Sequence, residues 1–201
     1  YKRQIDGDTP GLAAGAKEHK MGFRLSDTTE VVLENVRVPR SAVIGEVGCG
    51  MSIALNALNL SRAFISTLAV GIMQRALDEA VAYAKQRKQF GRRLIDFEMV
   101  QAMLADMAIK TEAARVLVNN CMRQMDAGEM VRKDGAIVKT FVTDAMQEVV
   151  SNAVQVLGGY GYSEEYPVEK LMRDAKIFQI FEGSNQIQRM TIAKELDREY
   201  R

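Results

Sequence analysis

The chain has 201 residues, of which 47% are hydrophobic and 26% are charged, so it is long enough to bury a core in one or two domains. Its formal net charge is +1, which excludes the strongly basic character typical of nucleic-acid-binding proteins. Its longest apolar runs are far shorter than a membrane-spanning segment. We therefore expect no nucleic-acid partner and no membrane span.

Residues that commonly bind metals are few in this sequence. The two cysteines, Cys49 and Cys121, are far apart and lack the spacing of metal ligands, which predicts free thiols in a reducing compartment. The single histidine, His19, lies between two charged residues and is most simply a surface residue. We therefore predict no metal site.

Residues 1–46 differ in pattern from the rest of the chain. The sequence DGDTPG at residues 6–11 is typical of turns. From Thr29 to Pro39 the residues are β-branched and partly alternating, which predicts a strand that the proline ends or places at a sheet edge. Glycines 45, 48 and 50 then predict a loop.

After Gly50 the apolar residues recur every three or four positions, which predicts helices. The expected helices span about 51–88, 100–125, 138–157, 168–176 and 184–197. The first is on the order of 55 Å long at 1.5 Å per residue. Gly91 breaks it, and Gly158 with Gly159 stops the third. The predicted fold is therefore mostly α, an antiparallel four-helix bundle over residues 47–201 preceded by a small β remnant over residues 1–46.

The sequence FEGSNQIQR at residues 181–189 places one carboxylate directly before a predicted helix. Glu182 lies in a turn that Gly183 makes flexible, and Ser184 is a candidate cap for the helix that follows. Taken alone, Glu182 has a simpler interpretation, because the helix dipole favours an anion near a helix N-terminus.

Together with YPVEKLMRDAK at residues 166–176, this sequence closely resembles the acyl-CoA dehydrogenase family. The resemblance extends over nearly the whole chain. Residues 8–11 and 21–28 resemble the end of the family's middle β domain, and residues from about Gly48 resemble its C-terminal helical domain. The chain is therefore similar to the second half of such an enzyme, and we expect a fragment that is inactive without the first half.

The resemblance implies flavin-dependent α,β-dehydrogenation of an acyl-CoA thioester to the trans-2-enoyl-CoA. It identifies Glu182 as the base that takes the α-proton, with FAD accepting hydride from the β-carbon. Some family members carry the base on the first long helix, just before an arginine; here that position is Ser61, so the chain resembles the Glu182 type. The positions matched to substrate contacts are Asn59, Arg62, Gly183 and Lys194. At position 59 the family often has Asp.

The resemblance also assigns residues to FAD. The segment RKQFG, which comprises Arg87, Lys88, Gln89, Phe90 and Gly91, resembles one that reaches the FAD pyrophosphate of a neighbouring subunit. A guanidinium pairs well with phosphate oxygens, although basic residues here also suit a helix C-terminus. The other matched positions are Glu98, Gln155, Gly158, Gly159, Ser184, Asn185 and Gln186. At position 98 the family usually has Gln.

The family resemblance further implies an acyl-CoA substrate, an electron-transfer flavoprotein as electron acceptor, and a homo-oligomer, either a dimer or a tetramer. The expected location is the bacterial cytoplasm or the mitochondrial matrix. Two alternatives remain open: a helical oligomerisation module without flavin, and an acyl-CoA oxidase, which differs in oxygen access. Flavin absorbance of the purified protein separates the module from the enzyme.

Overall fold

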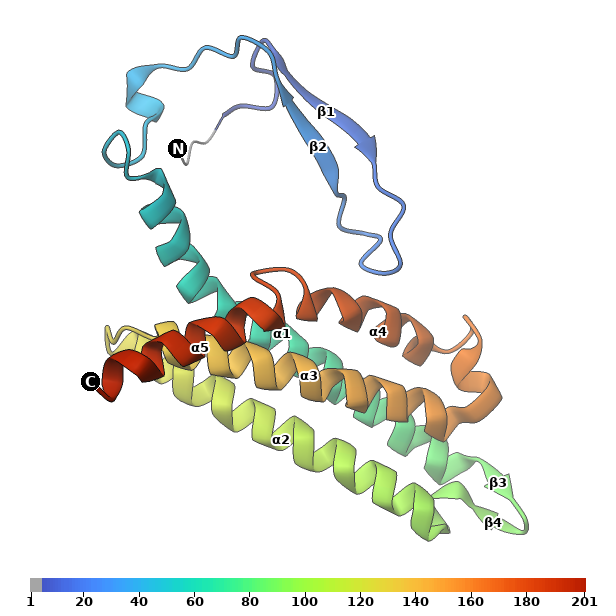
Figure 1. Ribbon diagram of the computed structural model, residues 1–201. Coiled ribbons are helices and arrows are strands. Elements are labelled where there is room, and N and C mark those ends of the chain that lie inside the picture. The colour runs from blue at the N-terminus through green and yellow to red at the C-terminus, as the bar shows by residue number, and fades with distance from the viewer. Residues whose placement is uncertain (1–4) are drawn as a thin grey trace. The chain divides into compact units, whose positions relative to one another are not determined.

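The computed structural model describes residues 5–201, which form five α-helices and two small antiparallel sheets (Figure 1). One sheet precedes α1, and the other lies between α1 and α2 in the chain. Residues 1–4 of the expected β remnant lie outside the described part. The chain divides into two compact units, the first ending at Leu58 and the second spanning Asn59–Arg201. This division falls inside the first long helix, and the sequence-based boundary between residues 46 and 47 stays a prediction.

The first unit contains a two-stranded sheet. Strand β1 (Leu12–Lys17) pairs antiparallel with β2 (Thr29–Leu33), with Leu12 opposite Leu33. The strand expected over residues 29–39 thus forms only in its first part, because Asn35 has a φ of 50° and turns the chain. The sequence did not predict β1, since LAAGAK lacks the β-branched residues that favour strands.

All the predicted helices form, with ends shifted by a few residues. They are α1 (Gly50–Gln86), α2 (Glu98–Asp126), α3 (Arg132–Leu157), α4 (Pro167–Ala175) and α5 (Asn185–Glu199). Gly158 ends α3 with a φ of 61°, which glycine adopts at little cost. The predicted bundle is confirmed, with α4 and α5 following one another alongside α3 as its fourth member (Figure 1).

Helix α3 is central to the second unit, because it packs against α2, α4 and α5 (Figure 1). Its buried apolar residues include Val138, Val142, Met146, Val149 and Ala153, which recur at steps of three and four. Helix α1 buries Met73, Ala76 and Ala80. It is also tied to α2, since Arg115 Nη2 donates a 2.5 Å hydrogen bond to Gln74 Oε1.

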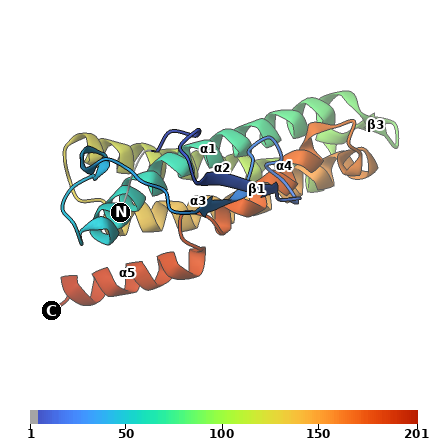
Figure 2. The same ribbon diagram turned by 90° about the horizontal axis from the view of Figure 1, so that it is seen from above.

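A short hairpin follows the C-terminal end of α1 (Figure 2). Its strands are β3 (Lys88–Gln89) and β4 (Arg92–Arg93), which pair antiparallel. Phe90 and Gly91 form the turn with φ values of 52° and 81°, the positive φ at both positions that favoured two-residue hairpins need. The sequence placed the helix break at Gly91, whereas α1 ends at Gln86, and it did not predict the hairpin.

By length and composition α1 could cross a membrane, and it is the one helix in residues 5–201 of which this is true. Core helices of soluble proteins meet the same criteria, so a single such helix is weak evidence for a span. Leu60, Phe64 and Leu68 of α1 are exposed. The expectation of no membrane span therefore stays a prediction.

Candidate active site

Glu182 lies in the loop between a short 3₁₀ helix (Lys176–Gln179) and α5. Glu182 and Gly183 have φ values of 55° and 86°, so two consecutive residues adopt left-handed backbone. The positive φ at position 183 favours glycine, and a Cβ there would lie 2.5 Å from Nε2 of Gln188 and would displace that amide. Ser184 then caps α5 as predicted, with its Oγ accepting from the N–H of Ile187 at 3.5 Å.

The carboxylate of Glu182 contacts α1. Ser61 Oγ donates a 2.6 Å hydrogen bond to Oε2 of Glu182, and both side chains are half-buried. The sequence assigned no role to Ser61. The hydroxyl restrains the carboxylate in one orientation.

Two of the predicted substrate-contacting residues lie on α1 beside Ser61. Arg62 Nη1 donates a 2.9 Å hydrogen bond to Asn59 Oδ1. Burial and the nearby Arg132 lower the pKa of Arg62, whereas the charge of Glu182 opposes that shift. Nε of Arg62 is buried and has no hydrogen-bond partner within residues 5–201. Asn59, Arg62, Glu182 and Gly183 thus lie in one region, whereas Lys194 is exposed farther along α5.

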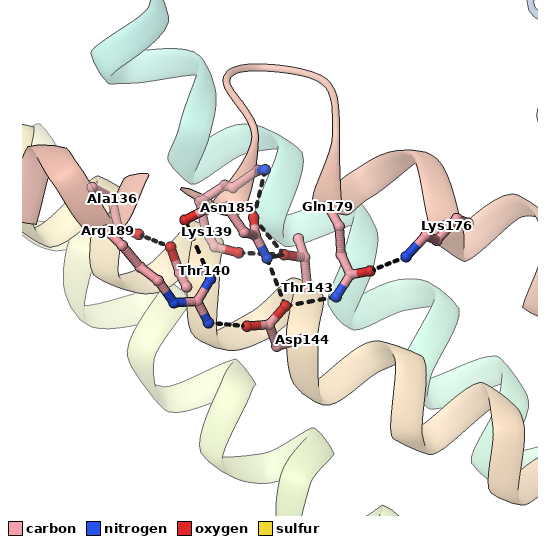
Figure 3. Close-up of polar contacts among 9 residues, drawn as sticks. All are labelled: Ala136, Lys139, Thr140, Thr143, Asp144, Lys176, Gln179, Asn185 and Arg189. Carbon is pink, nitrogen blue, oxygen red and sulfur yellow. Dashed lines mark hydrogen bonds and ion pairs between the residues drawn. The ribbon is translucent and has the colours of Figure 1, made fainter. Parts of the chain in front are cut away.

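A buried polar network lies beside the loop (Figure 3). Lys139 of α3 has no exposed side-chain surface, and its Nζ donates to the Gly183 carbonyl at 2.9 Å and to Asn185 Oδ1 at 2.7 Å. Burial lowers the pKa of Lys139 from 10.5 to about 8. The charges of Asp144 and Glu182 oppose this shift and that of Arg62 adds to it.

Asn185 links the start of α5 to α3 and is 2% exposed (Figure 3). Its Nδ2 donates to Thr143 Oγ1 at 2.9 Å and to Asp144 Oδ1 at 2.7 Å. Asp144 also accepts 2.6 Å hydrogen bonds from Arg189 and Gln179. Burial alone would raise the pKa of Asp144, but hydrogen bonds from Arg189, Gln179 and Asn185 outweigh burial and lower it. The Asn185 side chain thus forms its hydrogen bonds with residues of this chain. Its role in cofactor binding stays a prediction.

Several of the predicted cofactor residues line a cavity of about 560 Å³ at the ends of α1 and α3. Arg87, Gln89, Gly158 and Gly159 form part of its wall. A Cβ at either glycine would meet no atom within 4 Å, so the backbone there faces open space. A guanidinium beside accessible backbone can hold phosphate oxygens, so these residues fit a pyrophosphate group.

A second cavity, of about 510 Å³, includes Ser184, Asn185 and Gln186 in its wall, together with Asp144 and Arg189. The remaining predicted cofactor residues are exposed and line neither cavity: Lys88 and Phe90 in the hairpin, Glu98 at the start of α2, and Gln155 on α3. In residues 5–201, no group of three or more His, Cys, Asp or Glu side chains could hold a metal ion.

Sequence reasoning missed Ser61, Lys139, Asp144 and Gln188. Lys139 did carry a signal, because it falls on the stripe of α3 that includes Gly135, Val142 and Met146, at steps of four, three and four. A cation on an otherwise apolar stripe indicates a buried charge with a particular task. Gln188 likewise falls on the buried side of α5, three residues after Asn185.

Known proteins resemble this chain in sequence and in structure. Residues 48–196 match the family model described as acyl-CoA dehydrogenase, C-terminal domain. The chain is 43% identical over 195 residues to cyclohexane-1-carbonyl-CoA dehydrogenase of Geobacter metallireducens, a match that covers 97% of this chain and 51% of that protein. It is 41% identical over 189 residues to the CarC subunit of the caffeyl-CoA reductase-Etf complex of Acetobacterium woodii, with 94% and 50% covered.

Among solved structures, butyryl-CoA dehydrogenase of Megasphaera elsdenii superimposes with a TM-score of 0.94 at 44% identity, over 96% of this chain and 50% of that one. The chain thus spans about half the length of the relatives that it matches. The matched residues include Glu182 and its loop. On this evidence the chain belongs to the acyl-CoA dehydrogenase family and contains its C-terminal domain.

Proposed function

We propose that the protein containing this chain removes hydrogen from the α- and β-carbons of an acyl-CoA thioester and forms the trans-2-enoyl-CoA, with FAD as cofactor. The observation that carries this proposal is the Glu182 carboxylate, which Ser61 holds at 2.6 Å in a left-handed turn directly before α5. Relatives that are named dehydrogenases of CoA thioesters support it.

The chemistry requires a base, because the α-proton of a thioester is only weakly acidic. Glu182 accepts this proton, while the Ser61 hydroxyl keeps the carboxylate in one orientation. As the proton leaves, negative charge develops on the thioester oxygen, and the backbone N–H of Glu182 is our candidate donor to that oxygen. When bound, FAD supplies the hydride acceptor for the β-hydrogen.

Substrate and cofactor would be held by different parts of the second unit. Arg62 and Asn59 are proposed to contact the CoA part of the substrate, because both lie on α1 beside the Ser61 hydroxyl that binds Glu182. Arg87, Gln89 and the Gly158–Gly159 backbone would hold the FAD pyrophosphate in their cavity.

We further propose a homo-oligomer in which each FAD site is built from two subunits. The two groups of cofactor residues line separate cavities of one chain, which supports this arrangement. Leu60, Phe64 and Leu68 add an exposed apolar strip at four-residue steps along α1. An electron-transfer flavoprotein is the proposed electron acceptor, supported by the relative that is named as a subunit of an Etf complex.

The test is Glu182→Gln in the whole protein, with Glu112→Gln on the exposed surface of α2 as a matched control. Acyl-CoA esters from butyryl-CoA to palmitoyl-CoA are assayed with a dye acceptor, and in parallel with oxygen alone. We expect Glu182→Gln to lower turnover by roughly 10²–10⁴-fold, since the amide keeps the size but cannot accept a proton. Binding of the CoA ester and the activity of the control should be unchanged.

The alternatives give different results in the same assays. Fast turnover with oxygen alone would identify an oxidase. A colourless protein that oxidises none of the esters would favour the oligomerisation module. Near-normal turnover by Glu182→Gln would place the base on another residue.

A further inference from the structure

Lys139 is a buried cation that forms no ion pair in the part of the chain that the structure describes. Its side chain is fully buried in α3, and no carboxylate within residues 5–201 forms an ion pair with it. Burying an ammonium group in this way costs free energy. Burial lowers the pKa of Lys139 to about 8, in spite of the opposing charges of Asp144 and Glu182.

Fold stability alone gives little reason for a lysine at this position. Apolar residues of similar volume often replace buried charges with no loss of stability, or with a gain. The neighbours of Lys139 on the same stripe, Gly135, Val142 and Met146, are small or apolar. We therefore look for the role of the ammonium group in the hydrogen bonds that it donates.

The two hydrogen bonds that Lys139 Nζ donates go to the loop that presents Glu182 and to the first residue of α5. Nζ donates to the Gly183 carbonyl at 2.9 Å and to Asn185 Oδ1 at 2.7 Å. Gln188, also fully buried, donates from Nε2 to the same Gly183 carbonyl at 2.9 Å and to the Glu182 carbonyl at 3.1 Å. Two buried side chains from α3 and α5 thus converge on one carbonyl.

The loop needs such restraint because Glu182 is not a glycine, yet has a φ of 55°. Left-handed backbone costs a non-glycine residue roughly 1–2 kcal/mol, and it persists where the surroundings hold it in place. The carbonyl bonds from Lys139 and Gln188 supply that restraint.

We propose that Lys139 is a positioning residue for Glu182: it ties the Gly183 carbonyl to α3 and so fixes the turn that aims the carboxylate at the substrate α-carbon. This inference rests on the proposed role of Glu182 as the base. Lys139 itself does not touch the substrate and transfers no proton. Since small misplacements of a reacting group are costly, loss of the tie should slow proton abstraction and spare binding.

The experiment uses Lys139→Met in the whole, FAD-loaded protein. Met is unbranched like Lys and one atom shorter, and it removes the ammonium group, while the Gly183 carbonyl still accepts a hydrogen bond from Gln188. Turnover is measured with butyryl-CoA and with its α-deuterated form, or with another ester if the unaltered protein prefers it. Amide hydrogen exchange over residues 181–185 gives a readout that does not depend on activity.

We expect kcat to fall by roughly 10–100-fold, with KM changed by less than about twofold, because only the reacting geometry is altered. The isotope effect from the α-deuterated ester should rise, since proton abstraction becomes more rate-limiting. Exchange over residues 181–185 should become faster. A lysine that only supports folding would reduce the active fraction and leave the isotope effect unchanged.

Two further variants complete the test. Lys133→Met, on the same helix but in a surface ion pair with Glu199, should leave kcat and the isotope effect unchanged. Gln188→Met removes the other donor to the Gly183 carbonyl and should raise the isotope effect as Lys139→Met does. If Lys139→Met fails to fold, Gln188→Met tests whether the hydrogen bonds to this carbonyl position Glu182.

If the unaltered protein is active and Lys139→Met and Gln188→Met leave both kcat and the isotope effect unchanged, the inference is wrong and the proposed function still stands. An unaltered protein that oxidises no acyl-CoA would overturn the proposed function and the inference together.

Discussion

The hydroxyl of Ser61 donates a 2.6 Å hydrogen bond to the carboxylate of Glu182, although 121 residues separate the two in sequence. Ser61 lies in the first helix of the bundle and Glu182 in the loop before the last. The packing of these segments therefore sets the orientation of the proposed base. The hydrogen bond crosses no domain boundary, since both residues belong to the unit Asn59–Arg201.

Replacing Ser61 with Ala should slow the reaction. A hydrogen bond to a charged group contributes about 1.5–3 kcal/mol, but Glu182 is only half-buried, so we expect roughly a tenfold loss in the single-turnover rate. Ser61→Thr keeps the hydroxyl and should retain most of the rate. Equal rates for Ala and Ser at this position would show that the bond does not orient the base during turnover.

Lys139 should make stability depend on pH in the alkaline range. Its pKa in the folded chain is about 8, below the ordinary value of 10.5, so between these values the unfolded chain binds more protons. The stability contribution of Lys139 therefore rises with pH across this window. We expect the unfolding free energy, relative to Lys139→Met, to increase by roughly 1–3 kcal/mol from about pH 7 to about pH 10 in urea titrations.

The comparison with Lys139→Met isolates this effect. The charges that face Lys139, on Arg62, Asp144 and Glu182, are present in both proteins and largely cancel in the difference. A difference that stays flat across the window would mean that Lys139 keeps an ordinary pKa in the folded protein.

Arg87→Ala should weaken FAD retention more than folding. Arg87 is exposed at the edge of the cavity that includes Gly158 and Gly159, and its guanidinium lies 5.7 Å from the centre of the Tyr160 ring. Exposed residues contribute little to stability, so the melting temperature should change little. The measurement is the FAD content after dialysis, with Arg75→Ala, an exposed arginine of α1, as control. A variant that keeps its FAD but melts much lower would assign Arg87 a structural role.

Asn185→Ala should be strongly destabilising, whereas Gln186→Ala should not. Asn185 is 2% exposed and bonds Lys139, Thr143 and Asp144, so its loss leaves buried polar groups with fewer partners. We expect a loss of about 2–4 kcal/mol in urea unfolding, against about 0.5 kcal/mol or less for the exposed Gln186. Similar values for the two variants would contradict the structural importance of the network.

Much of the fold follows from local sequence patterns. Apolar residues at three- and four-residue steps predict each helix, and Gly158 marks the end of α3, because both signals depend only on neighbouring residues. Strand β1 was not predicted, because its small residues have little preference of their own for a strand and adopt one through pairing with β2.

The candidate site was predictable only in part. Glu182 and the Ser184 cap could be named from a single stretch of sequence, because a turn before a helix is a local feature. The contacts of Ser61 with Glu182 and of Lys139 with Gly183 join residues that lie far apart in the chain, so they depend on how the helices pack. Helix packing also places the predicted cofactor residues in two separate cavities. The sequence by itself thus determined the helices and the carboxylate, and the tertiary structure decided what holds that carboxylate, because only packing brings distant side chains within hydrogen-bond distance.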